Sequence, residues 1–81
     1  METRLAVIAI IVDNTDSVER LNGVLHEYRE WILGRMGIPY RQKGRHIISV
    51  AVDAPQQAIS ALSGKIGALP GVTTSTVYSK S

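Results

Sequence analysis

The stretch Leu5-Ala-Val-Ile-Ala-Ile-Ile-Val12 decides the fold of this chain. It is an unbroken apolar run, rich in β-branched residues, and it ends at the polar residues 13–16. Such a run is typical of a β-strand that is covered on both faces. We therefore expect it to be a central strand of a sheet.

A helical pattern follows this strand. Its apolar residues recur at spacings of three and four, so they share one stripe of a helix: Val18, Leu21, Leu25, Tyr28 and Ile32. Asp16 or Thr15 is expected to cap the helix, and Gly34 is expected to end it. The first helix is therefore predicted over about residues 16 to 33.

The remaining segments predict three more strands and a second helix. Residues 36–43 contain Pro39, which favours an edge strand because proline cannot donate to a ladder. Residues 46–53 alternate between two faces and predict a second central strand. A helix is predicted over 55–67, where Pro55 suits the first turn, and a last strand over 72–78.

The predicted order of elements is β-α-β-β-α-β. This order indicates one α+β domain over residues 1–81 with a ferredoxin-like fold, in which a four-stranded antiparallel sheet carries both helices on one face. Right-handed crossovers place the first and third strands in the middle of the sheet. The uncovered face therefore presents apolar residues of the first strand and needs a partner.

The sequence leaves open which side of the first strand faces the helices. One set of alternating residues is Leu5, Val7, Ala9 and Ile11, and the other is Ala6, Ile8, Ile10 and Val12. The candidate interface consists of Leu5, Val7, Ala9, Ile11, Ser49 and Ala51. We expect a homo-oligomer, a dimer or a tetramer, because a chain of 81 residues buries only a small core.

The composition excludes several kinds of chemistry. The chain has no cysteine, which removes disulfides, thiolate metal sites, iron–sulfur clusters and cysteine nucleophiles. His26 lies one turn from Asn22 and Glu30, but so few ligands rarely hold a metal, and His46 stands apart at the start of a strand. We therefore predict no catalytic residues, no metal site and no cofactor, and we expect a protein that is not an enzyme.

The positive charge is local. The net charge is only +2, yet residues 29–46 contain five Lys and Arg residues against one Glu. Four of these residues are candidates for a rim that binds an anion or an effector: Arg35, Arg41, Lys43 and Arg45. The alternative is a solubilising strand edge. Direct binding of nucleic acid is not expected, because no aromatic residues interleave with these charges.

Two motifs resemble a known family. The segments Arg35-Met-Gly-Ile-Pro-Tyr40 and Ile59-Ser-Ala-Leu-Ser-Gly-Lys-Ile-Gly-Ala-Leu-Pro-Gly-Val72 are similar to those of regulators of iron-only hydrogenase systems. That family resembles ACT domains and the C-terminal domain of nickel-responsive repressors. The resemblance implies an ACT-like βαββαβ fold, association through the sheets, and a role beside the hydrogenase or its maturation.

The chain also departs from those relatives. It offers two histidines and no cysteine for a nickel site. Residues 13–16 stand where ACT effector sites usually have a glycine that lets the backbone approach a ligand.

These observations favour a non-enzymatic, oligomeric regulatory or ligand-sensing module whose effector binds between subunits. The alternative is a structural adaptor or assembly factor that docks a hydrogenase maturation protein and binds no small molecule. No apolar run approaches the roughly 20 residues of a membrane helix, so we expect no membrane association and a cytoplasmic location.

Overall fold

Four strands form one antiparallel sheet in the computed structural model, which describes residues 2–80. The strands are β1 (Arg4–Val12), β2 (Ile32–Tyr40), β3 (Arg45–Ala54) and β4 (Val72–Tyr78), and they lie in the order β2-β3-β1-β4. The two central strands are therefore β3 and β1, as predicted.

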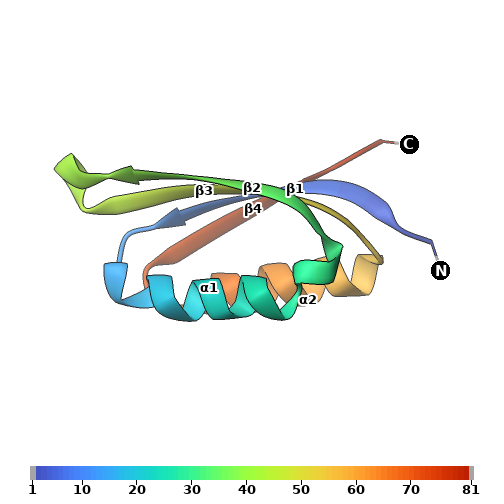
Figure 1. Ribbon diagram of the computed structural model, residues 1–81, viewed down its shortest axis with the longest axis horizontal. Coiled ribbons are helices and arrows are strands. Elements are labelled where there is room, and N and C mark those ends of the chain that lie inside the picture. The colour runs from blue at the N-terminus through green and yellow to red at the C-terminus, as the bar shows by residue number, and fades with distance from the viewer. Residues whose placement is uncertain (1, 81) are drawn as a thin grey trace.

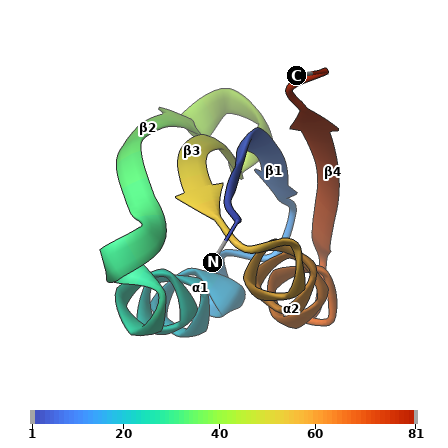
Figure 2. The same ribbon diagram turned by 90° about the vertical axis from the view of Figure 1, so that its right-hand side faces the viewer.

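Both long helices lie against the same face of the sheet (Figures 1 and 2). They are α1 (Val18–Glu27) and α2 (Gln56–Gly67). Three short 3-10 turns join the larger elements: η1 (Thr15–Ser17), η2 (Arg29–Trp31) and η3 (Arg41–Lys43). This arrangement confirms the α+β ferredoxin-like fold with two helices on one face.

The first helix is shorter than its sequence pattern predicts. It ends at Glu27, and the Trp31 amide donates to the Tyr28 carbonyl oxygen at 3.0 Å within a tighter turn. Tyr28, Trp31 and Ile32 all pack on the core, so their apolar spacing imitates a continuing helix. Gly34, which was expected to end the helix, lies within β2.

The start of the helical segment also differs from the prediction. Asp16 and Thr15, the expected caps, both lie inside η1. The cap is Asn14, whose Oδ1 accepts a hydrogen bond from the Asp16 amide at 3.0 Å. The short polar side chain one residue earlier thus satisfies the free backbone donors.

The core lies between the sheet and the helices. Its buried apolar side chains come from one face of β1 and β3 and from the inner stripes of the helices: Ala6, Ile8, Ile10, Val12, Leu21, Leu25, Ile48, Val50, Val52, Ala54, Ile59, Leu62 and Ile66. Each fully buried branched side chain contributes roughly 1.5–3 kcal/mol relative to an exposed one. The core therefore uses only one face of the sheet.

The β2–β3 hairpin extends beyond the helices (Figure 1). β2 is an edge strand, as Pro39 predicted, and it begins at Ile32 rather than at residue 36. From residue 33 to residue 40 every residue of β2 is exposed. The hairpin end of the sheet thus has no helical layer beneath it.

Candidate functional site

The face of the sheet that points away from the helices, here called the open face, is apolar. β1 turns its odd-numbered residues toward this face, so Leu5 is 52% exposed while Ile8 is fully buried. Val7 and Ile11 are exposed to a similar degree as Leu5. The parity that the sequence left open is therefore settled: the even-numbered side chains of β1 face the helices.

The central strand β3 continues the open face. Its register with β1 pairs Ala9 with Ser49 and Val7 with Ala51. Directly paired residues in antiparallel strands share a face. All six residues of the candidate interface therefore lie on the open face, with Ser49 and Ala51 half-buried.

β2 adds large side chains that the sequence analysis did not assign to this face. The register with β3 shifts by one residue between Ile32 and Gly34, so Leu33 forms a bulge and lies 67% exposed. Further along, Met36 pairs with Ser49 and Ile38 pairs with Ile47. Alternation within residues 36–40 indicates Met36 and Ile38, whereas Leu33 belongs to β2 and not to the first helix, where its sequence spacing predicts it.

β4 completes the open face on its other side. Val77 pairs with Val7 and is 68% exposed, and the neighbouring open-face residues are the polar Thr73 and Ser75. The open face is therefore most apolar at the end of the sheet where Leu5, Leu33 and Val77 come together.

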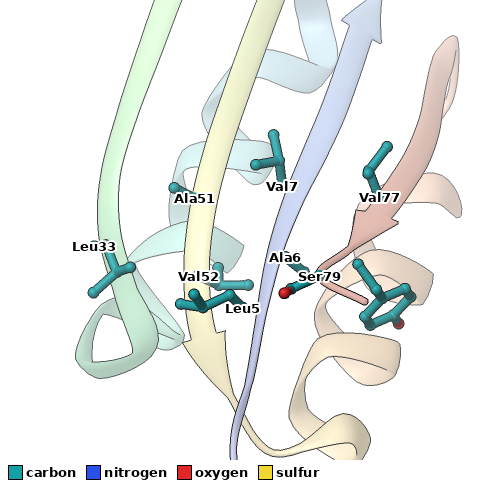
Figure 3. A pocket seen from close by; sticks show the side chains of 9 residues that line it. Leu5, Ala6, Val7, Leu33, Ala51, Val52, Val77 and Ser79 are labelled. Carbon is teal, nitrogen blue, oxygen red and sulfur yellow. The ribbon is translucent and has the colours of Figure 1, made fainter. Parts of the chain in front are cut away.

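A shallow cavity of about 380 Å³ lies at that end (Figure 3). Its lining is almost entirely apolar and comes from all four strands and the residue that follows β4: Leu5, Ala6, Val7, Leu33, Ala51, Val52, Val77, Tyr78 and Ser79. Figure 3 shows Leu33 and Val77 standing on opposite sides, with Leu5 and Ala51 between them. The cavity therefore suits an apolar group.

The polar groups near this cavity are engaged in structural contacts. The Tyr78 hydroxyl accepts a hydrogen bond from Gln56 Nε2 at 2.8 Å, and the Arg4 guanidinium lies over the Tyr78 ring at 4.4 Å from its centroid. The Ser79 amide donates to the Leu5 carbonyl oxygen at 2.9 Å. The cavity can therefore bind a ligand through apolar contacts. Its lining offers no pair of groups for acid–base chemistry.

The four basic residues of the predicted rim occupy different surroundings. Arg35 turns toward α1, where its Nη2 donates to Asn22 Oδ1 at 2.9 Å. Arg45 Nε pairs with Asp13 Oδ1 at 2.7 Å, and Lys43 is exposed in η3. Arg35 pairs with the buried Val50 on the helix-covered face, whereas Arg45 belongs to the odd-numbered residues of β3 on the open face. The structure therefore does not bring these two arginines together.

One member of the rim, Arg41, has a side chain outside the described part of the structure. Its backbone lies in η3 at the hairpin end.

Neither histidine belongs to a cluster of metal-binding side chains in the described part of the chain. Within residues 2–80, no group of three or more His, Cys, Asp or Glu residues could hold a metal ion. In the same range, no helix is long and apolar enough to cross a bilayer.

The family model for TM1266-like proteins matches residues 4–76 of the chain. The chain belongs to this family. The TM1266-like family is described as "Iron-only hydrogenase system regulator, putative". The match confirms the resemblance seen in residues 35–40 and 59–72.

A solved TM1266-like structure has the same fold along the whole chain. It is the uncharacterized protein TM1266 from Thermotoga maritima, which is 36% identical, with a TM-score of 0.93 over 98% of this chain and 100% of that one. No curated protein matches the chain.

Two more distant structures share only the fold. A formyltetrahydrofolate deformylase from Pseudomonas putida is 16% identical, with a TM-score of 0.65 over 90% of this chain and 28% of its own. An unknown protein from Galdieria sulphuraria is 18% identical, with a TM-score of 0.66 over 99% of this chain and 47% of its own. The fold thus also occurs as part of larger chains.

Proposed function

We propose that this chain is a cytoplasmic, non-enzymatic regulatory module of an iron-only hydrogenase system that works as a homo-oligomer and senses a small molecule. The observation that carries the proposal is the apolar open face. Leu5, Val7 and Ile11 on β1 are exposed on this face. Ile47 on β3, which pairs with Ile11, and large apolar residues on both edge strands extend the apolar surface. Contiguous apolar surface of this kind marks a protein interface.

The size of the open face supports a second copy as its partner. Strands lie about 4.8 Å apart and rise about 3.3 Å per residue, so a four-stranded face eight residues long projects roughly 500 Å² before side-chain relief is added. A stable interface buries about 800 Å² of accessible surface on each partner. The open face is therefore large enough to supply most of the surface that each subunit contributes to a dimer interface.

The position of the apolar cavity supports a sensing role. It opens on the same face, so a second copy that covers this face would turn the shallow cavity into an enclosed site between subunits. Cavities that bind small molecules are mostly apolar and enclosed. Lys43 and Arg45, with Arg41, lie at the opposite, hairpin end of the sheet and stay candidates for a separate anion-binding rim.

The test is a native mass spectrum of the freshly purified protein, which reports the subunit number and any retained small molecule together. We expect a dimer or a larger even oligomer that carries, or takes up from a metabolite extract, a defined additional mass. A bare oligomer that takes up nothing would contradict the sensing role and favour the adaptor, which would then be expected to copurify with a hydrogenase maturation protein. A monomer at micromolar concentration would contradict the homo-oligomer.

A further inference from the structure

A second recess lies on the helix-covered side of the molecule, between α1 and the beginning of β2. Its volume is about 330 Å³, and six residues line it: Asn22, Leu25, His26, Arg29, Ile32 and Arg35. We call it the α1–β2 recess. Its lining differs from that of the apolar cavity, because two guanidinium groups and an imidazole stand around it.

Both guanidinium groups are held in place by a hydrogen bond within the protein. Arg35 Nη2 donates to Asn22 Oδ1 at 2.9 Å, and Arg29 Nη1 donates to the His26 carbonyl oxygen at 2.9 Å. A guanidinium has five N–H donors in a fixed planar fork. Each group therefore keeps further donors for a ligand while its position is already fixed.

No carboxylate lines the recess among the described residues. Glu27, which is next to His26 in sequence, pairs instead with Lys65 of α2, with 2.9 Å between Oε2 and Nζ. In residues 2–80 neither Arg29 nor Arg35 has a carboxylate within ion-pair distance. The positive charge of the recess is therefore not neutralised from within.

The end of α1 works against an anion, because the last carbonyl groups of a helix carry partial negative charge. Arg29 offsets this effect, since it already donates to the His26 carbonyl oxygen. Arg35 comes from β2 and bonds to a side chain, so its charge remains available. Arg35 is thus the main candidate ligand, and Arg29 is the second.

The floor of the recess is apolar. Leu25 is 2% exposed, and Ile32 is half-buried. A ligand that combines a charged group with a flat or aliphatic part would meet the guanidinium groups and this floor at the same time. Inorganic ions lack the second part.

We propose that the α1–β2 recess binds a small organic oxyanion, a phosphate or carboxylate held by Arg35 and Arg29, with its apolar part on Leu25 and Ile32. Charge-assisted hydrogen bonds from arginine suit both oxyanions. The recess lies on the opposite side from the open face, so the inference does not depend on the oligomer proposed above.

The experiment is a ¹H–¹⁵N NMR titration of the full chain at low ionic strength with phenyl phosphate and, separately, benzoate. We expect saturable shifts confined to residues 22–35 and to the arginine side-chain Nε signals. Arg35→Gln is expected to weaken binding roughly tenfold or more, the loss typical of a hydrogen bond between charged groups. Arg29→Gln is expected to weaken it less.

The matched control is Arg20→Gln, which removes an equal charge from an exposed position of α1 outside the recess. It should leave the affinity within about twofold, since screened surface charges contribute little. Binding of only one of the two probes would support the site and identify the oxyanion. Shifts that fail to saturate, or an Arg20→Gln effect as large as that of Arg35→Gln, would overturn the proposal.

Two simpler probes test the charged part and the apolar part of the ligand separately. Benzyl alcohol should not shift the arginine signals, because it carries no charge, and inorganic phosphate should bind more weakly than phenyl phosphate. Equal binding of benzyl alcohol would overturn the role of the guanidinium groups. Equal binding of inorganic phosphate would overturn the role of the apolar floor.

Discussion

The two faces of β1 are equally apolar in sequence, but one is buried and the other is exposed. Ile8 and Ile10 are buried beneath the helices, whereas Val7 and Ile11, their neighbours, are each more than two-fifths exposed. A strand with one solvated face normally alternates apolar and polar residues. β1 does not alternate, so its sequence fits a strand that is covered on both faces.

The chain therefore carries more apolar surface on its sheet than its own helices can cover. The helix-covered face stabilises the single chain, and the open face is available to a partner. Substitutions on the two faces should therefore change different quantities: the free energy of unfolding of the monomer on one side and the association constant on the other.

The largest expected effect comes from Ile10→Ala. Ile10 is 1% exposed, so this substitution leaves a cavity and should lower the free energy of unfolding by about 2–5 kcal/mol. Ile11→Ala is the matched control, the same change one residue further along the strand. Its effect on the dilute protein should be below about 1 kcal/mol, because Ile11 is 45% exposed.

Urea unfolding at several protein concentrations separates these two variants. If Ile11 lies in an interface, the Ile11→Ala midpoint should fall at high protein concentration and match the wild-type midpoint at low concentration. Equal losses from both variants at every concentration would contradict the difference between the faces.

A smaller effect distinguishes two turns at the same end of the sheet, the β2–β3 hairpin and the turn before β4. Gly44 in the hairpin and Gly71 before β4 both have positive φ angles, of 61° and 70°, so an alanine costs roughly 1–2 kcal/mol at either position. A Cβ atom at Gly71 would lie 2.7 Å from Asn14 Cβ, whereas one at Gly44 would meet nothing within 4 Å. Gly71→Ala should therefore lower the melting temperature more than Gly44→Ala. A larger loss from Gly44→Ala would contradict the difference in packing between the two turns.

The smallest effect concerns the surface of the helical layer. The Glu27 carboxylate, and after it Tyr28, raises the pKa of Lys65 above its ordinary value of 10.5. The stabilisation is therefore complete below pH 10.5 and is lost as the pH rises through the raised pKa. Glu27→Gln should bring the Lys65 pKa back toward 10.5, as measured by NMR titration of the Lys65 side chain. Glu30→Gln is the control, and an equal change in that variant would refute the pairing.

Much of the fold could be predicted because its local signals agree with the packing. The edge position of β2, the second helix and the last strand all follow from proline placement and periodicity. The end of α1 could not be predicted, because Tyr28, Trp31 and Ile32 reach the core from a turn and a strand as well as they would from a helix.

The candidate site was less predictable than the fold. The β1 sequence is apolar on both sides, so it does not encode which side faces the helices. Leu33 reaches the open face through a bulge, which depends on the register with β3 and has no local signal. Arg35 and Asn22 are 13 residues apart and meet only when β2 returns alongside α1.

The most direct test of the open-face interface is sedimentation equilibrium of the wild-type protein, Val7→Lys and Ala61→Lys. Val7 lies on the open face, and Ala61 is an exposed position of α2. We expect a dimer or larger oligomer for the wild type and Ala61→Lys. We expect a folded monomer for Val7→Lys, since two-fold symmetry would bring unpaired charges into the interface twice. A monomeric wild type, or an oligomer that Val7→Lys leaves intact, would contradict the open-face interface.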